Sequence, residues 1–136
     1  MGRVFITFCL LLGSGQAFGE TGPLKIDQYG FLSFKKELSY LNRFATTLIG
    51  WTGARGYIVI YPGRSNTLRQ AQQRASRAKT YLLNKRGIPP DGIVTVIGGC
   101  REEATVDLWI TVKNGAPPIL TPPNDWIGVP KDYRCP

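Results

Sequence analysis

Histidine is absent from this chain of 136 residues, which removes the commonest general base and metal ligand in proteins. The sequence also lacks a Gly-x-Ser-x-Gly nucleophile elbow, a phosphate-binding P-loop and a Cys-x-x-Cys pair. Its only adjacent carboxylates, Glu102 and Glu103, do not suggest the separated acid and base of a glycosidase. These absences argue against an enzyme, and we predict no catalytic residue, no metal site and no cofactor.

Long hydrophobic runs are also missing. The most apolar stretch covers residues 4–12, far fewer than the roughly 20 residues with which a helix crosses a bilayer. Arg3 precedes this stretch and small residues follow it, which is the layout of a secretory signal peptide. We expect cleavage after Ala17, with Gly19 as the second choice, and no transmembrane segment in the mature chain. The predicted location is the periplasm or the exterior; the alternative is a buried N-terminal strand or helix.

Acidic residues are few: 9 stand against 17 basic ones, for a formal net charge of +8. Outside the cytoplasm, a basic protein meets anionic lipid headgroups, wall phosphates and peptidoglycan carboxylates. Nucleic acid is the usual partner of such a charge, but export argues against a nucleic-acid partner here. The same charge also keeps a domain soluble, so both a binding role and a solubilising role remain open.

Cysteine is scarce, and only Cys100 and Cys135 remain after the predicted cleavage. In an oxidising compartment such an even pair is typical of a disulfide. Chain entropy predicts that this bridge stabilises the fold by roughly 3–4 kcal/mol. The alternative is two unpaired thiols.

Hydrophobic periodicity predicts an α/β (α+β sandwich) domain in residues 18–113, which are enough for one core. Strands are expected at residues 24–29, 57–61, 93–97 and 105–112, and helices at residues 33–48 and 68–82. The predicted order is βαβαββ, with two helices on one face of a four-stranded sheet. Alanines would bring the second helix close to the sheet, while its basic residues face outward.

Residues 114–136 form a proline-rich tail that holds six of the ten prolines, so we expect it to be extended. Its apolar residues are costly to leave exposed together. We therefore expect the tail to lie over the sheet face opposite the helices and to be held there by the Cys100–Cys135 bridge. The residues expected beneath it are Tyr57, Val59, Tyr61 and Trp109.

The stretch QRASRAKTYLLNKRGIPPDGI, residues 73–93, resembles the second helix and following loop of the OmpA-like domain. This family is the periplasmic peptidoglycan-binding module of outer-membrane proteins. An Arg-Ala pair opens the helix body, Tyr-Leu closes it, and Gly-Ile leads into the next strand. The resemblance extends in outline over most of residues 24–113 and implies an envelope protein.

The resemblance implies a ligand site at the second helix. The family holds the diaminopimelate group of peptidoglycan between an aspartate after its second strand and an arginine on the following helix. The arginine falls on Arg74. Arg64 stands at the place of the aspartate, so the chain keeps a donor for a ligand carboxylate and reverses the charge of the acceptor.

The residues themselves also point to anion binding there. Free N–H groups at a helix start, joined by arginine side chains, favour carboxylate or phosphate. Asn66 or Thr67 is expected to cap this helix. The predicted ligand-binding residues are Arg74, Arg64, Arg77 and Asn66. The alternative is a solvated basic helix face.

Three hypotheses follow. The first is a module that contacts peptidoglycan or another anionic wall polymer through Arg74. The second is an envelope protein-interaction module on the same fold that has lost peptidoglycan binding. The third, which requires that the signal peptide is misread, is a nucleic-acid binder that stacks bases on Tyr57 and Tyr61.

Overall fold

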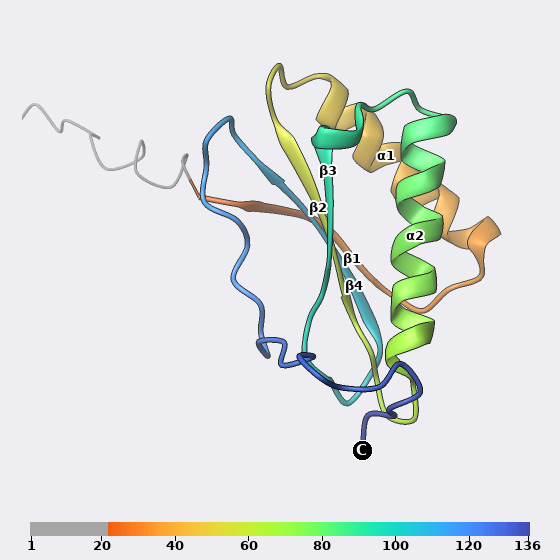
Figure 1. Cartoon of the computed structure of the whole chain (residues 1–136). Coiled ribbons are helices and arrows are strands. Elements are labelled where there is room, and N and C mark those ends of the chain that lie inside the picture. Colours follow the sequence, from red (N-terminus) through yellow and green to blue (C-terminus); the bar gives the residue numbers. More distant parts are fainter. Residues whose placement is uncertain (1–21) are drawn as a thin grey trace, which may run out of the picture.

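The computed structural model describes residues 22–136; residues 1–21, which hold the predicted signal peptide, lie outside the described residues. The elements follow one another in the predicted order (Figure 1). They are β1 (Leu24–Gly30), α1 (Phe34–Ile49), β2 (Arg55–Tyr61), α2 (Leu68–Asn84), the short 3-10 helix η2 (Pro90–Gly92), β3 (Ile93–Ile97) and β4 (Thr105–Thr111). The predicted α+β class and βαβαββ order are confirmed.

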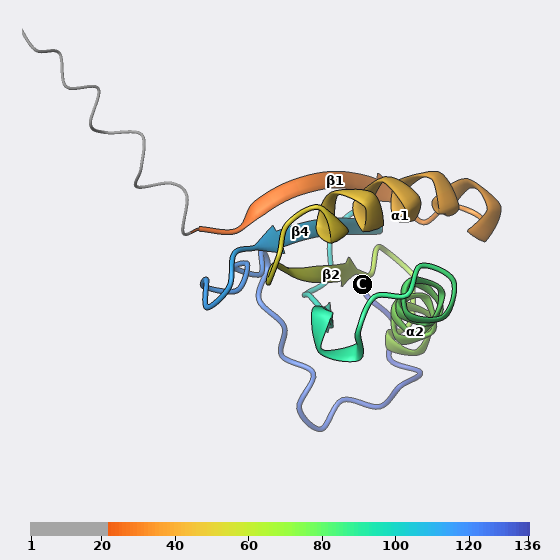
Figure 2. The ribbon, with the colours of Figure 1, turned by 90° about the horizontal axis from the view of Figure 1, so that it is seen from above.

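The four strands form one mixed sheet in the order β1-β4-β2-β3. β2 and β3 are parallel, and β4 runs antiparallel to both β1 and β2. The carboxyl ends of β1, β2 and β3 therefore lie at the same end of the sheet. Both helices cover one face of the sheet, and the chain after β4 passes over the other face (Figures 1 and 2).

Local signals explain where the two helices begin. The Ser33 hydroxyl accepts a hydrogen bond from the amide of Lys36 at the start of α1. At the start of α2, Thr67 and Gln70 form a reciprocal capping box, so Thr67 rather than Asn66 is the cap. Each helix then presents an apolar stripe to the sheet, as the period predicted.

The core lies between the helices and the sheet. At Gly56 a β-carbon would stand 2.7 Å from the Phe44 ring, so α1 packs directly on the backbone of β2. The alanines of α2 are buried and let this helix pack closely on β2 and β3. The fully buried large side chains of this core are Leu41, Phe44, Ile58, Ile60, Leu82, Ile93, Val106, Leu108 and Ile110.

The opposite sheet face is also withdrawn from solvent: Val59, Tyr61 and Asp107 are almost fully buried. The amide of Thr121 donates to the Tyr61 hydroxyl at 3.1 Å, and the carbonyl of Pro122 accepts from the amide of Gly99 at 2.9 Å. These bonds attach the segment after β4 to this face and to the loop after β3.

Cys100 and Cys135 form a disulfide, as predicted, with their α-carbons 5.7 Å apart. The bridge joins the loop after β3 to the end of the chain. Among residues 22–136, no helix is long and apolar enough to cross a membrane.

Candidate functional site

Arg74 lies on the side of α2 that faces the turn between β1 and α1. Its Nη1 donates to the carbonyl of Leu32 at 2.8 Å, and its guanidinium carbon stands 4.3 Å from the centroid of the Phe31 ring. The side chain is half-buried, not turned outward as expected from the helix pattern. Only one of its five N–H groups is used by this chain, since no other hydrogen bond and no ion pair reaches Arg74 from the described residues.

Arg77 lies one helical turn further and is paired. Its Nη2 donates to Oε1 of Glu37 at 3.1 Å, while Oε2 of Glu37 accepts from the Tyr29 hydroxyl at 2.8 Å. The Arg77 guanidinium also lies over the Phe34 ring, 4.8 Å from its centroid. Glu37 is fully buried. This arginine therefore serves first to neutralise a buried carboxylate between α1 and α2.

Arg74 and Arg77 lie near a single carboxylate, that of Glu37, and this excess of positive charge affects the pKa of Arg74. Burial and the neighbouring Arg77 lower the pKa of Arg74, an effect that Glu37 only partly offsets. Burial, together with the Glu37 carboxylate, raises the pKa of Tyr29 far above its ordinary value. An anionic group placed against Arg74 would relieve the unfavourable charge there.

Arg64 and Asn66 lie elsewhere on the loop between β2 and α2. The Arg64 side chain is exposed and stands 3.8 Å from Glu102 of the β3–β4 loop. Asn66 accepts from the amide of Gly63 at 3.0 Å and so closes the turn. No hydrogen bond or ion pair among residues 22–136 joins either one to Arg74. Of the predicted site residues, the structure thus brings only Arg77 close to Arg74, and it places Arg64 beside an acidic residue.

The start of α2, which we expected to offer free N–H groups to an anion, is occupied. The amide of Leu68 donates to the carbonyl of Tyr133 at 3.1 Å, and the amide of Arg69 donates to that of Lys131 at 2.9 Å. The next amides are satisfied by the cap. The end of the chain has therefore taken the place of an anion at this helix terminus.

Two site residues, Glu37 and Tyr29, were missed by the sequence analysis. The signal for Glu37 was present: it stands three residues after Phe34 and four before Leu41, on the apolar stripe of α1. An acidic residue at such a position is buried and needs a cation.

Tyr57 and Tyr61 are buried, and the Arg101 guanidinium covers the Tyr61 ring at 3.4 Å, so neither ring is open to a nucleobase.

A second polar cluster, also missed, lies on the face opposite the helices. Asp107 is buried, with Arg101 at 3.5 Å and Lys25 at 3.7 Å from its Oδ2. Arg101 also donates to the carbonyl of Thr121, at 2.7 Å from Nη2. This cluster attaches the chain after β4 to the sheet, and we assign it a structural role.

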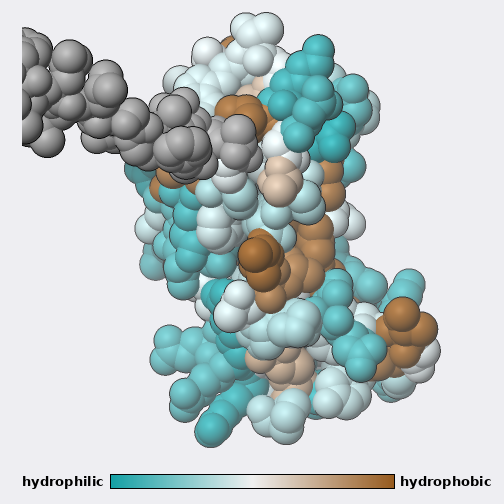
Figure 3. Space-filling view, turned by 90° about the vertical axis from the view of Figure 1, so that its left-hand side faces the viewer, coloured by the Kyte–Doolittle hydropathy of each residue, from teal (hydrophilic) through white to brown (hydrophobic). Residues whose placement is uncertain are grey.

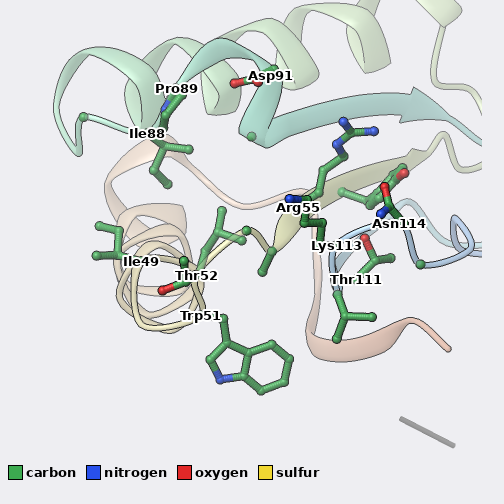
Figure 4. Close-up of a pocket in the computed structure, with 18 residues that line it drawn as sticks. Ile49, Trp51, Thr52, Arg55, Ile88, Pro89, Asp91, Thr111, Lys113 and Asn114 are labelled. Carbon is green, nitrogen blue, oxygen red and sulfur yellow. The ribbon is translucent and has the colours of Figure 1, made fainter. Parts of the chain in front are cut away.

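One pocket among the described residues lies away from Arg74. It has a volume of about 720 Å³ and lies at the opposite end of the sheet, where β2 and β3 begin and β4 ends (Figure 4).

A search of known protein families, of curated proteins and of solved structures found no match to this chain.

Proposed function

We propose that this chain is an exported, non-enzymatic binding module of the bacterial cell envelope that resembles OmpA-like domains and holds an anionic group at Arg74. The single observation that carries the proposal is a half-buried guanidinium to which residues 22–136 offer one hydrogen-bond acceptor and no ion-pair partner, so that four of its N–H groups stay free of them. A charge withdrawn from water in this way gains from an anionic partner.

The ligand class follows from the geometry of the guanidinium. Its planar fork matches a carboxylate or a phosphate, which it binds through two parallel hydrogen bonds. The predicted location supplies both, as stem-peptide carboxylates of peptidoglycan or as phosphates of another wall polymer. Because Leu32 and Phe31 already fix one edge and one face of Arg74, the ligand would meet a preorganised group.

Binding to purified sacculi across a salt series tests this proposal, with the chain lacking residues 1–17. We expect saturable binding at physiological salt that is lost in Arg74→Ala. The matched control is Arg69→Ala, because Arg69 is exposed on the same helix and its side chain makes no hydrogen bond or ion pair with the described residues. Absent binding by the unmodified chain, or equal losses in both variants, would reject the proposal.

A second candidate function is binding to an envelope protein. It is favoured by the segment after β4, where the Ile119 and Ile127 side chains are 84% and 95% exposed although the disulfide and the Tyr61 contact hold this segment in place. The side of the molecule along which the chain after β4 runs carries separate hydrophobic patches between hydrophilic ones (Figure 3). Affinity capture from envelope extracts should then fail for Ile119→Ser/Ile127→Ser and persist for Arg74→Ala.

A further inference from the structure

The large pocket at the end of the sheet remote from Arg74 has one apolar side. Ile49 ends α1 and is 60% exposed, and Trp51 in the following turn is 42% exposed. Ile88, in the loop between α2 and β3, lies on the same side of the cavity as Ile49 (Figure 4) but is only 5% exposed, so Ile49 and Trp51 supply most of the apolar surface. Large apolar side chains gathered around a concavity gain about 25 cal/mol for each Å² that a ligand removes from water.

The other side of the pocket is basic. Arg55 is the first residue of β2 and pairs with Thr111, the last residue of β4. Lys113, two residues after Thr111, therefore lies just beyond the same end of the sheet. A β-carbon built at Gly53 would stand 3.5 Å from Cβ and Cδ of Lys113, so this side chain lies against the turn between α1 and β2. Figure 4 draws Arg55 and Lys113 across the cavity from Ile49.

Neither cation has a partner of its own. Among residues 22–136, no ion pair or side-chain hydrogen bond involves Arg55 or Lys113, or Asp91, the one acidic residue of the lining. The lining therefore keeps an excess of positive charge beside an apolar wall. That combination complements a ligand with an apolar body and a negatively charged end.

We propose that this pocket binds a small amphipathic carboxylate, with its acyl chain against Ile49, Trp51 and Ile88 and its carboxylate between Arg55 and Lys113. The volume of about 720 Å³ falls within the range of small-molecule sites and accommodates a medium-length chain. The site is separate from Arg74, so it stands or falls independently of wall binding.

Isothermal titration with octanoate, and with 1-octanol as its uncharged counterpart, tests the proposal on the disulfide-bonded chain without residues 1–17. We expect saturable binding of octanoate that exceeds that of 1-octanol. In Arg55→Gln/Lys113→Gln, octanoate affinity should fall about tenfold, the loss expected when charge-assisted hydrogen bonds are removed.

The matched control is Arg69→Gln/Lys131→Gln, which removes the same two charge types from a groove beside α2. This control should bind octanoate as the unmodified chain does, and Arg55→Gln/Lys113→Gln should still bind sacculi. Equal binding of octanoate and 1-octanol, equal losses in both double variants, or no saturable octanoate binding would overturn the proposal.

Discussion

The carboxylate of Glu37 lies 3.1 Å from the guanidinium of Arg77 and is fully withdrawn from solvent. The pair joins α1 to α2, and the Tyr29 hydroxyl, from the end of β1, completes it at 2.8 Å. One buried cluster thus joins three elements, β1, α1 and α2, next to Arg74. Such a contact fixes relative position more than it adds net stability, because both charges were hydrated before folding.

Removal of Arg77 is expected to cost more than removal of the Glu37 charge. Arg77→Met leaves a buried carboxylate with one neutral partner. We expect a loss of about 2–4 kcal/mol, somewhat less than for a fully buried pair because Arg77 is itself part-exposed. Glu37→Gln leaves a guanidinium that can turn to water and should cost less. Urea unfolding measures both.

The control for this prediction is Arg43→Met. Arg43 also forms an ion pair, with Asp27 at 2.9 Å, but its side chain is largely exposed, so the change should have little effect. In the Glu37→Gln/Arg77→Met double variant the losses should be clearly less than additive. Equal costs for Arg77→Met and Arg43→Met would contradict a special role for the buried pair.

Alkaline stability should depend on Tyr29. Burial raises its pKa in the folded chain, whereas the unfolded chain releases the proton near pH 10. The folded state therefore holds more protons above that pH, and the free energy of unfolding falls by about 1.4 kcal/mol for each further pH unit. Below pH 10 the contribution is fully present.

The test compares the unmodified chain with Tyr29→Phe in urea unfolding from pH 8 to pH 11.5. Tyr29→Phe should lose the steep alkaline part of the profile. Tyr133→Phe, which changes an exposed tyrosine, should keep it. Parallel profiles for the Tyr29 variant and the unmodified chain would show that another group controls the alkaline loss.

The disulfide should both stabilise the fold and close the start of α2. Cys100→Ser/Cys135→Ser is expected to lower the free energy of unfolding by roughly 2–4 kcal/mol. Hydrogen exchange should rise first at the amides of Leu68 and Arg69, because the chain end that covers them is then released. The amide of Ala71, bonded to the Thr67 carbonyl within α2, should change little. Unchanged exchange at Leu68 and Arg69 would mean that the tail stays in place without the bridge.

The sequence predicted the sheet and helices because their signals are local. A run of β-prone residues predicted β2, and alternation of apolar and polar residues predicted β4. The spacing of Ala71, Ala75 and Ala78 predicted the face of α2 that packs on the sheet. Residue type alone proposed Asn66 or Thr67 as the cap of α2, and Thr67 is the cap. Each of these features depends on residues that lie close to one another in the sequence.

The candidate site was only half predictable, because it depends on contacts between distant segments. Arg74 and Arg77 were expected to face solvent, but each guanidinium lies over an aromatic ring and donates to a carbonyl or a carboxylate. Phe31 and Phe34 supply those rings from more than 40 residues earlier in the chain. The hydrophobic period of a helix does not show which residues of another element lie next to it in space. For the same reason, nothing local to α2 indicated that residues near the chain end would cover its first amides.

The final prediction concerns how the tail is attached. A β-carbon at Gly98 would stand 2.2 Å from the Tyr61 ring, whose hydroxyl accepts the Thr121 amide, and the Gly98 carbonyl itself accepts from the Trp126 indole at 3.1 Å. Gly98→Ala should therefore displace the ring and loosen both attachments, at a cost of about 1–3 kcal/mol. Gly30→Ala is the control, since its β-carbon meets only an ordinary contact at 3.7 Å.

Two readouts separate displacement of the tail from a general loss of packing. Thermal unfolding should show a clear drop for Gly98→Ala and little change for Gly30→Ala. The indole N–H resonance of Trp126 should move toward its solvent-exposed position only in Gly98→Ala, because its acceptor is the carbonyl of the changed residue. If stability falls while that resonance stays in place, Tyr61 tolerates the added methyl group without releasing the tail, and the attachment must rest on the disulfide instead.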